Sequence, residues 1–480
     1  MAGFTIDFGF GRNVIRGARN VTVNGKPFGF EVELGINHYR GTEVSCLDQL
    51  SLAIDGAPIA ATDMLFCVNG KLVPLNRLSS MYEEYWAVLD TASLLVLNRS
   101  LAEGSHQIDV TCVVRFTKLG DGLFFSSDNS GSKRLELEAP RELAPYLGTQ
   151  PRREVEGIEP AVSMYCYTLP FVTQADFGVE EIFAEIARLG ISRVELVGAQ
   201  TFRNYPSPLD NEVAEVLALA DKYGIEIYSY GGYVESVRVG DRDYTHEETM
   251  ADVLVDLMTA KRLGATVMRE FFTAEMVPEL VPLAEAFEIT VVWEMHRPIT
   301  PSSPSTQALI QALQQANSKW VGICPDFGVF IEQPAPAAYN NYVAQGARPD
   351  LLDYIIASRH AGLDRDEVTA QINAQGGGRG EAQAIDDWYG FMSFEPADLD
   401  GFKAMLPYCR YFHGKFYGID EAGNDPMIPQ EALLGAIAAT GFNGVVLTEY
   451  EGWQFGLDDA AAQVPRHLQL ERRILGRPSE

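Results

Sequence analysis

The sequence predicts a chain of two parts: an antiparallel β-sandwich at residues 1–150, then a (β/α)8 TIM barrel at residues 151–480. Three observations lead to this fold class. Short apolar segments in the first third are separated by hairpin-type turn sequences. After Pro160, eight strand patterns follow one another, nearly all with a helix pattern after them, which is typical of a closed parallel barrel. The chain is also too long for one typical domain.

Composition and charge limit the possible partners. The chain has 480 residues, of which 46% are hydrophobic and 21% charged, and its formal net charge is −29. Such an acidic surface repels nucleic acid and anionic membranes, so we expect neither as a partner. No apolar run approaches the roughly 18–20 residues that cross a membrane, and the N-terminus lacks a signal-peptide pattern. The six cysteines form no CxxC pair, which favours reduced thiols in a cytoplasmic protein.

The first third carries Asn-Gly or Asp-Gly pairs at 24–25, 55–56 and 69–70. These dipeptides supply the positive φ angles of tight hairpin turns. The segments around them predict strands at 21–23, 28–34, 50–54, 64–68, 85–89, 94–97 and 107–116. Their short, regular spacing predicts the antiparallel sandwich.

Three polar segments complete this part of the chain. Residues 126–132 predict a loop by composition, and residues 139–160, rich in proline and charge, predict a linker with the domain boundary near Gln150. The cluster His38-Tyr39-Arg40 follows a strand. We interpret it as a surface loop, with the alternative that it reaches into a neighbouring active site.

The remainder predicts barrel strands at 162–167, 193–197, 225–230, 266–270, 289–295, 320–326, 409–415 and 444–449. Helices are predicted at 179–189, 211–223, 245–263, 276–287, 305–317 and 429–440. An open doubly wound sheet is the alternative. The first strand is not followed by G-x-G-x-x-G, the usual cofactor signal of that fold, so the barrel is favoured.

A long insertion, residues 327–406, separates the sixth and seventh strands. At this end of a barrel such an insertion commonly builds a substrate lid. It contains the glycine-rich stretch 376–380, which we interpret as a flexible hinge or tip. A phosphate-binding role is disfavoured because the stretch follows no strand.

Four strands end in residues that bind metals. The fifth ends in Glu294, the sixth in Asp326 and the eighth in Glu449, and the seventh carries His413 near its end. They belong to successive strands, whose C-terminal ends converge at one face of a barrel. Three carboxylates packed together repel one another unless a cation joins them. The oxygen-rich set favours Mn²⁺ or Mg²⁺, with Co²⁺, Fe²⁺ or Zn²⁺ as alternatives. The competing interpretation is four separate helix-cap or salt-bridge residues.

This Glu, Asp, His and Glu pattern resembles the xylose-isomerase-like TIM-barrel superfamily over roughly residues 162–475. The sequence Glu294-Met295-His296 resembles the E-x-H of the α subunit of bacterial C-glycoside deglycosidases, as does the run from His413 to Tyr417. Residues 1–136 resemble the β subunit of the same enzymes in length and strand pattern. This chain would then contain, in one polypeptide, the α and β subunits that are usually two separate chains. Ketose 3-epimerases of the superfamily usually have a histidine shortly after the aspartate of the sixth strand. This chain has no such histidine in the residues directly after Asp326.

The resemblance implies a metal-dependent lyase that cleaves 3-oxo-glycosides, C-linked or O-linked. With a ketone at C3, a base removes the acidic C2 proton and the enolate expels the group at C1. The metal would bind the C3 carbonyl and the C2 oxygen. His296, not a ligand, is the candidate base, since an imidazole ordinarily titrates near pH 6.5, about neutral. Lys415 would polarise the carbonyl or hold a hydroxyl, unless it only caps the barrel end.

Weaker candidates surround these residues. Arg297 and Glu270 are candidate substrate-binding residues, and Arg269 is a weaker candidate for a supporting role. An aromatic wall for the aglycone would draw on Tyr165, Tyr167, Tyr230, Tyr233 and Trp453, although aromatic residues there are as often core. Cys324 is predicted to be a small buried residue. His246, His360 and His467 are predicted to lie on the surface.

Two other functions stay open: a metal-dependent sugar isomerase or epimerase of the same superfamily, and a non-catalytic carbohydrate-binding protein. The sequence contains no hydride-transfer site that we can identify. A separate sugar C3 oxidoreductase would therefore supply the glycoside substrate. The resemblance also implies a homo-oligomer.

Overall fold

The computed structural model describes residues 3–9, 11–120, 123–149, 152–234, 236–390, 392–455 and 459–476. The chain divides into two compact units. The first, which we call the sandwich unit, comprises residues 1–146, 204–210 and 233–262. The second, the barrel unit, comprises residues 147–203, 211–232 and 263–480. Gln150, where we predicted the boundary, lies outside the described residues.

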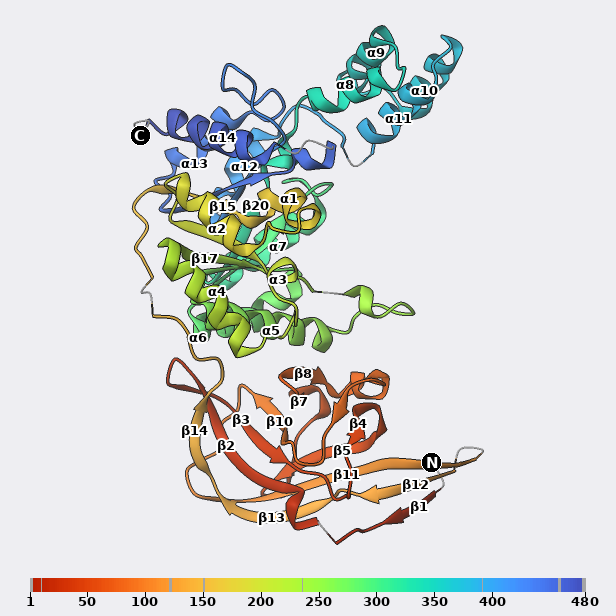
Figure 1. Ribbon diagram of the computed structural model, residues 1–480, viewed down its shortest axis with the longest axis vertical. Helices are drawn as coiled ribbons and strands as arrows, with labels where there is room; N and C mark the ends of the chain where they lie inside the picture. Colours follow the sequence, from red (N-terminus) through yellow and green to blue (C-terminus); the bar gives the residue numbers. More distant parts are fainter. Residues whose placement is uncertain are drawn as a thin grey trace. The chain divides into compact units, whose positions relative to one another are not determined.

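The sandwich unit contains two large sheets (Figure 1). One has the order β1 (Gly3–Ile6), β12 (Leu123–Asp128), β11 (Ser105–Gly120), β5 (Leu47–Ile54) and β6 (Ala57–Pro58), with β13 (Gly131–Glu136) also pairing with β11. The other has the order β14 (Glu138–Glu142), β2 (Ile15–Val23), β3 (Lys26–Leu34), β10 (Ala92–Leu97), β7 (Met64–Val68) and β8 (Lys71–Pro74). A two-stranded sheet joins β4 (Thr42–Glu43) to β9 (Tyr85–Trp86).

The predicted hairpin turns are present. Asn24, Asp55 and Asn69 have φ of 52°, 52° and 51°, and the glycine after each is also in the left-handed region. The pairing differs from the prediction at two edges, because β1 pairs with β12 and β14 pairs with β2 in parallel.

The predicted loop at 126–132 is wrong, since these residues belong mainly to β12 and β13. Tertiary partners satisfy its polar groups: Ser127 is buried and its Oγ donates a hydrogen bond to the Asn37 carbonyl, 2.6 Å away. The predicted linker likewise begins inside β14.

The barrel unit is built on eight parallel strands, which confirms the predicted fold class (Figure 1). They are β15 (Ile158–Ser163), β16 (Arg193–Val197), β17 (Glu226–Gly231), β18 (Val267–Arg269), β19 (Thr290–Met295), β20 (Val321–Pro325), β21 (Phe412–Phe416) and β22 (Gly444–Tyr450). Isolated bridges between Ile323 and Cys409 and between Asp326 and His413 join β20 to β21 and close the ring.

Helices follow most of these strands in sequence. They include α1 (Thr168–Thr173), α2 (Val179–Arg188), α3 (Gly198–Thr201), α4 (Asp210–Tyr223), α5 (His246–Leu263), α6 (Val277–Phe287), α7 (Pro304–Ala316), α13 (Gln430–Ala439) and α14 (Ala460–Ile474). The first strand ends earlier than predicted. Ser163 Oγ accepts the Tyr165 backbone N–H, which turns the chain into a 3-10 helix at Met164–Tyr167.

One apolar layer lies inside the barrel. It contains Ala161, Tyr228, Val267, Val292, Cys324, Tyr411, Val445 and Leu447. Because side chains alternate along a strand, the residue two positions later points the same way. Glu294, Asp326, His413 and Glu449 each follow a member of this layer by two positions. The core therefore sets the register that turns all four toward the barrel axis. Cys324 is buried, as predicted.

The insertion is helical. It contains α8 (Pro336–Ala344), α9 (Pro349–His360), α10 (Arg365–Ala374), α11 (Arg379–Trp388) and α12 (Leu399–Met405), and α8 to α11 pack against one another (Figure 1). The glycine-rich stretch forms the tight turn between α10 and α11 and the first two residues of α11. The Glu381 carboxylate accepts the backbone N–H groups of Gly378 and Arg348, 2.9 and 2.7 Å away, which fixes this turn.

No helix in the described part of the chain is both long enough and apolar enough to cross a membrane.

Candidate metal centre

Four side chains from consecutive strands meet at the C-terminal end of the barrel. Glu294 lies on β19, Asp326 just after β20, His413 on β21 and Glu449 on β22. Each offers a ligand atom, and these atoms all lie within 4.8 Å of one another. Three of the four residues are buried and Glu294 is half-buried. The structure thus brings together the residues that the sequence placed at four strand ends.

The buried polar atoms of these side chains fit a divalent cation. His413 Nδ1 lies 2.9 Å from Glu294 Oε1 and 3.3 Å from Glu449 Oε2. Asp326 Oδ2, His413 Nδ1 and Glu449 Oε2 are all buried and have no hydrogen bond of good geometry among the described residues, although Lys415 Nζ lies 3.0–3.1 Å from the two carboxylate oxygens as an ion pair. Buried polar atoms normally have hydrogen-bond partners. Three carboxylates and one imidazole are a donor set that a metal satisfies.

Asp326 is fixed by its own backbone. Its Oδ1 accepts the Gly328 N–H at 2.6 Å, at the start of the 3-10 helix Phe327–Phe330. The second oxygen, Oδ2, is thereby directed toward the other three side chains.

Basic side chains offset part of the negative charge. Arg269 Nη1 lies 3.3 Å from Glu294 Oε2. Burial by itself would raise the pKa of Glu294, but the charges of Arg269 and His413 hold it well below its ordinary value. Burial also opposes ionisation of Glu449, yet Lys415 and His413 lower its pKa to about 2. Asp326 differs, because burial raises its pKa despite the neighbouring Lys415. Unlike charges therefore hold two of the three carboxylates ionised.

Lys415 is an internal cation, not the cap of a barrel end. Only 2% of it is exposed, and Nζ lies 3.0–3.1 Å from carboxylate oxygens of Asp326, Glu449 and Glu451. Burial would lower the pKa of this ammonium, but the three carboxylates raise it well above its ordinary value. Lys415 thus carries its charge beside two of the four candidate ligands.

His296 lies next to the four residues without belonging to the group. Its Nε2 is 3.8 Å from Asp326 Oδ2, and 36% of its side chain is exposed. Its Nδ1 is 3.0 Å from the Arg297 carbonyl oxygen. A carbonyl only accepts, so Nδ1 is the protonated nitrogen of the neutral ring. The lone pair of Nε2 then faces the site.

The weaker candidates have different positions. Arg297 turns toward the insertion, where its Nη2 donates to the carbonyl oxygen of Ser393 and to Ser393 Oγ. Glu270 is buried directly after β18, and its Oε1 accepts the Phe271 N–H at 2.7 Å. Arg269, as described above, contacts a candidate ligand directly. Of these three residues, Arg269 is the one that contacts a candidate ligand, Glu294.

Of the predicted aromatic wall, one pair lies at the site. The rings of Tyr165 and Trp453 meet edge to face at 5.5 Å, and Lys415 Nζ lies 5.8 Å from the Tyr165 ring centre. Tyr167 and Tyr230 are buried, and Tyr233 belongs to the sandwich unit. In that unit, His38 is buried against aromatic rings, while Tyr39 and Arg40 are exposed.

The surface prediction for His467 is wrong, although it is correct for His246 and His360. His467 is wholly buried, and its ring stacks on Phe416 with ring centres 4.1 Å apart. Thr448 Oγ1 lies 3.2 Å from its Nδ1. Burial lowers its pKa to about 3. The ring therefore packs as a neutral group behind β21 and β22.

Sequence reasoning missed two buried carboxylates near the centre, Glu195 and Glu451. Glu451 pairs with Lys415, and Glu195 Oε2 lies 3.3 Å from His413 Nε2. Both gave a signal in the sequence. Glu195 is an acidic residue within the otherwise apolar segment Val194–Val197, and Glu451 lies two positions beyond Glu449, on the same face of the chain.

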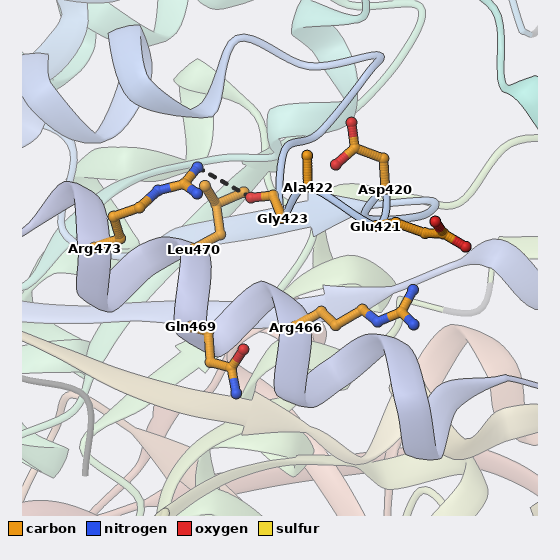
Figure 2. Close-up of a pocket in the computed structure, with 8 residues that line it drawn as sticks. All are labelled: Asp420, Glu421, Ala422, Gly423, Arg466, Gln469, Leu470 and Arg473. Atoms are coloured by element: carbon orange, nitrogen blue, oxygen red, sulfur yellow. Dashed lines mark hydrogen bonds between the residues drawn. The ribbon is translucent and has the colours of Figure 1, made fainter.

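A separate surface hollow of about 500 Å³ lies between α14 and the turn after β21 (Figure 2). Arg473 Nη2 donates a 3.0 Å hydrogen bond to the Gly423 carbonyl at its edge. The hollow includes none of the predicted site residues.

Comparisons with known proteins match both parts of the chain. Residues 183–470 match the family model described as xylose isomerase-like TIM barrel. Residues 10–117 match the model described as C-glycoside deglycosidase beta subunit.

Individual relatives match part of this chain. A 3'-dehydrocarminate deglycosidase alpha subunit from a Microbacterium species is 26% identical over 66% of this chain and 94% of its own length. A C-glycoside deglycosidase alpha subunit from Microbacterium trichothecenolyticum is 25% identical over 61% of this chain and 83% of its own. Together with the family models, these relatives confirm the resemblance identified from the sequence. Among solved structures, D-allulose 3-epimerase from a Methylomonas species is 12% identical, with a TM-score of 0.41 over 67% of this chain and 100% of its own.

Proposed function

Since the chain belongs to the xylose isomerase-like TIM-barrel family, we propose that it is a metal-dependent deglycosidase that cleaves 3-oxo-glycosides by elimination. The observation that carries this proposal is the placement of His296 beside Glu294, Asp326, His413 and Glu449. The names of the relatives supply the substrate class, glycosides with a carbon-linked aglycone.

The four clustered residues would hold the ion, and their oxygen-rich set favours Mn²⁺. When bound, the ion would supply Lewis acidity toward the C3 carbonyl and the C2 oxygen of the sugar. The remaining chemistry falls to the side chains of this chain.

His296 is the proposed base. Its hydrogen bond to the Arg297 carbonyl leaves the Nε2 lone pair facing the centre. Nε2 takes the C2 proton, and the electron pair of the C2–H bond passes into the C2–C3 enolate. General-base catalysis of this kind typically contributes about 10²–10⁴-fold in rate.

Elimination completes the reaction. The enolate re-forms the C3 carbonyl, a C1–C2 double bond appears, and the bond from C1 to the aglycone breaks. Its electron pair leaves with the aglycone, which then takes up a proton. We assign to Lys415 the role of donating a hydrogen bond to the C3 oxygen as negative charge develops there.

One partner follows from this chemistry, and the comparisons bear on the subunits. A sugar C3 oxidoreductase must supply the 3-oxo-glycoside, because the elimination neither adds nor removes a hydride. The relatives described above are named alpha subunits, while residues 10–117 match a beta-subunit family model. We propose that this single polypeptide supplies both, and that it forms a homo-oligomer.

The test is product analysis with purified protein, Mn²⁺ and a 3-oxo-C-glycoside such as 3'-dehydrocarminate, the compound in the name of one relative. We expect release of the free aglycone, abolished by EDTA and strongly reduced in His296→Gln. Solvent deuterium entering a free ketose without aglycone release would indicate an isomerase or epimerase instead. Tight glycan binding with no metal and no turnover would indicate a carbohydrate-binding protein.

A further inference from the structure

The buried carboxylate of Glu195 has neighbours from three other strands. Glu195 lies on β16, between β15 and β17, and only 1% of it is exposed. Its Oε1 accepts a hydrogen bond from Ser163 Oγ at 3.3 Å, and its Oε2 accepts one from Ser229 Oγ at 3.2 Å. A carboxylate removed from water is costly unless such partners compensate it. These two hydroxyls hold its oxygens in fixed positions.

The third neighbour of Glu195 is His413, on β21. Its Nε2 lies 3.3 Å from Glu195 Oε2, and the contact reaches across the barrel interior. Among the described residues, the ion pair of Glu195 is with His413. The arrangement gives the two ring nitrogens of His413 different surroundings: Nε2 faces Glu195, and Nδ1 faces Glu294 and Glu449.

The environment of His413 restricts rotation of its ring. Tyr411 OH lies 2.7 Å from Ser229 Oγ, so the serine that binds Glu195 is itself held. The Tyr411 ring also meets the His413 ring edge-on, with centres 5.5 Å apart. His413 is therefore enclosed by hydrogen-bonded neighbours on the side away from the candidate ligands.

We propose that Glu195 is a positioning residue, which accepts the Nε2–H of His413 and so presents the Nδ1 lone pair to a divalent ion. A histidine that binds a metal through one nitrogen typically donates the other N–H to a carboxylate or carbonyl, and that bond fixes the tautomer. The proposal rests on the metal site of the proposed function. It assigns to Glu195 neither contact with the ion nor contact with the sugar.

The first test measures the affinity for Mn²⁺ alone, by equilibrium dialysis of the full-length protein. Glu195→Gln keeps the size of the side chain and its contacts with the serines, but removes the charge that orients the imidazole. We expect the Kd for Mn²⁺ to rise about 10–100-fold. Glu195→Asp, which keeps the charge, is expected to recover part of the affinity and provides a second variant should Glu195→Gln fail to fold.

A matched control is Glu226→Gln. Glu226 is another buried barrel carboxylate, on β17, but it pairs with Arg193 and not with His413. If the role of Glu195 is purely structural, both variants should lower thermal stability, and the Kd for Mn²⁺ should be the same in both. Our proposal predicts that the Kd rises only in Glu195→Gln.

The second readout is spectroscopic. In the Zn²⁺-loaded protein labelled with ¹⁵N-histidine, His413 should show the Nε2–H tautomer, its signals being assigned by their loss in His413→Gln. Glu195→Gln should shift this signature, and Glu226→Gln should not.

An unchanged Kd and an unchanged tautomer in Glu195→Gln would overturn the role of Glu195 while leaving the proposed function intact. Wild-type protein that binds no divalent ion would overturn both.

Discussion

Replacing Lys415 with methionine tests the charge balance of the centre. The substitution keeps a long unbranched side chain but removes the ammonium that lies 3.0–3.1 Å from Asp326, Glu449 and Glu451. Breaking a buried ion pair by removing one partner typically costs about 3–5 kcal/mol, because the other charge is left uncompensated. Lys415 is only 2% exposed, so solvent screens little of this loss. We expect metal-free Lys415→Met to lose free energy of unfolding of that order.

Metal should reverse part of the loss. Asp326 and Glu449 are candidate ligands, so a divalent ion would compensate them in place of the ammonium, whereas Glu451 would stay unpaired. Lys415 also repels an ion bound by the same oxygens. We therefore expect Mn²⁺ to stabilise Lys415→Met more than it stabilises the wild type.

The assay is urea unfolding of both proteins in EDTA and in Mn²⁺, followed by far-UV circular dichroism. Lys222→Met is the control, because its ion pair with Glu180 lies on the surface and contributes little. Equal stability of Lys415→Met and wild type in EDTA, or equal stabilisation by Mn²⁺, would refute this reasoning.

The remaining predictions concern three other residues. His296→Gln should keep the Mn²⁺ affinity within a few-fold while lowering kcat about 10²–10⁴-fold; an active variant would exclude it as the base. Glu294→Gln should weaken Mn²⁺ binding measured by dialysis at least 10-fold, and unchanged binding would remove it from the ligands. The unfolded chain protonates His467 near pH 6.5, but the folded chain only near 3, so stability falls as pH drops. From pH 7 to 5 this loss is about 2 kcal/mol, and His467→Asn should show a smaller loss in urea unfolding.

The sequence was sufficient to identify the cluster because strand periodicity is local information. An apolar strand that ends in an acid or a histidine indicates a barrel-mouth residue, and four such endings gave Glu294, Asp326, His413 and Glu449. The same rule cannot find residues whose partners lie across the barrel. Glu195 meets His413 only after the ring of strands closes, and nothing near it in the sequence indicates that contact.

Predictions from composition were wrong at positions where tertiary contacts compensate buried polar groups. Ser127 was assigned to a loop, yet its hydrogen bond to Asn37 lets it lie buried in a strand. The surface prediction for His467 fails because this residue belongs to the face of α14 that packs on Phe416. The helices of the insertion were also not predicted, and glycine content suggested flexibility where Glu381 fixes a turn.

The most direct test of the central claim is a crystal structure of the Mn²⁺-loaded protein, with the ion located from its anomalous scattering. We predict one peak within bonding distance of Glu294, Asp326, His413 and Glu449, with the His296 ring near it but unbound. An ion bound elsewhere, or none at this face of the barrel, would contradict the account.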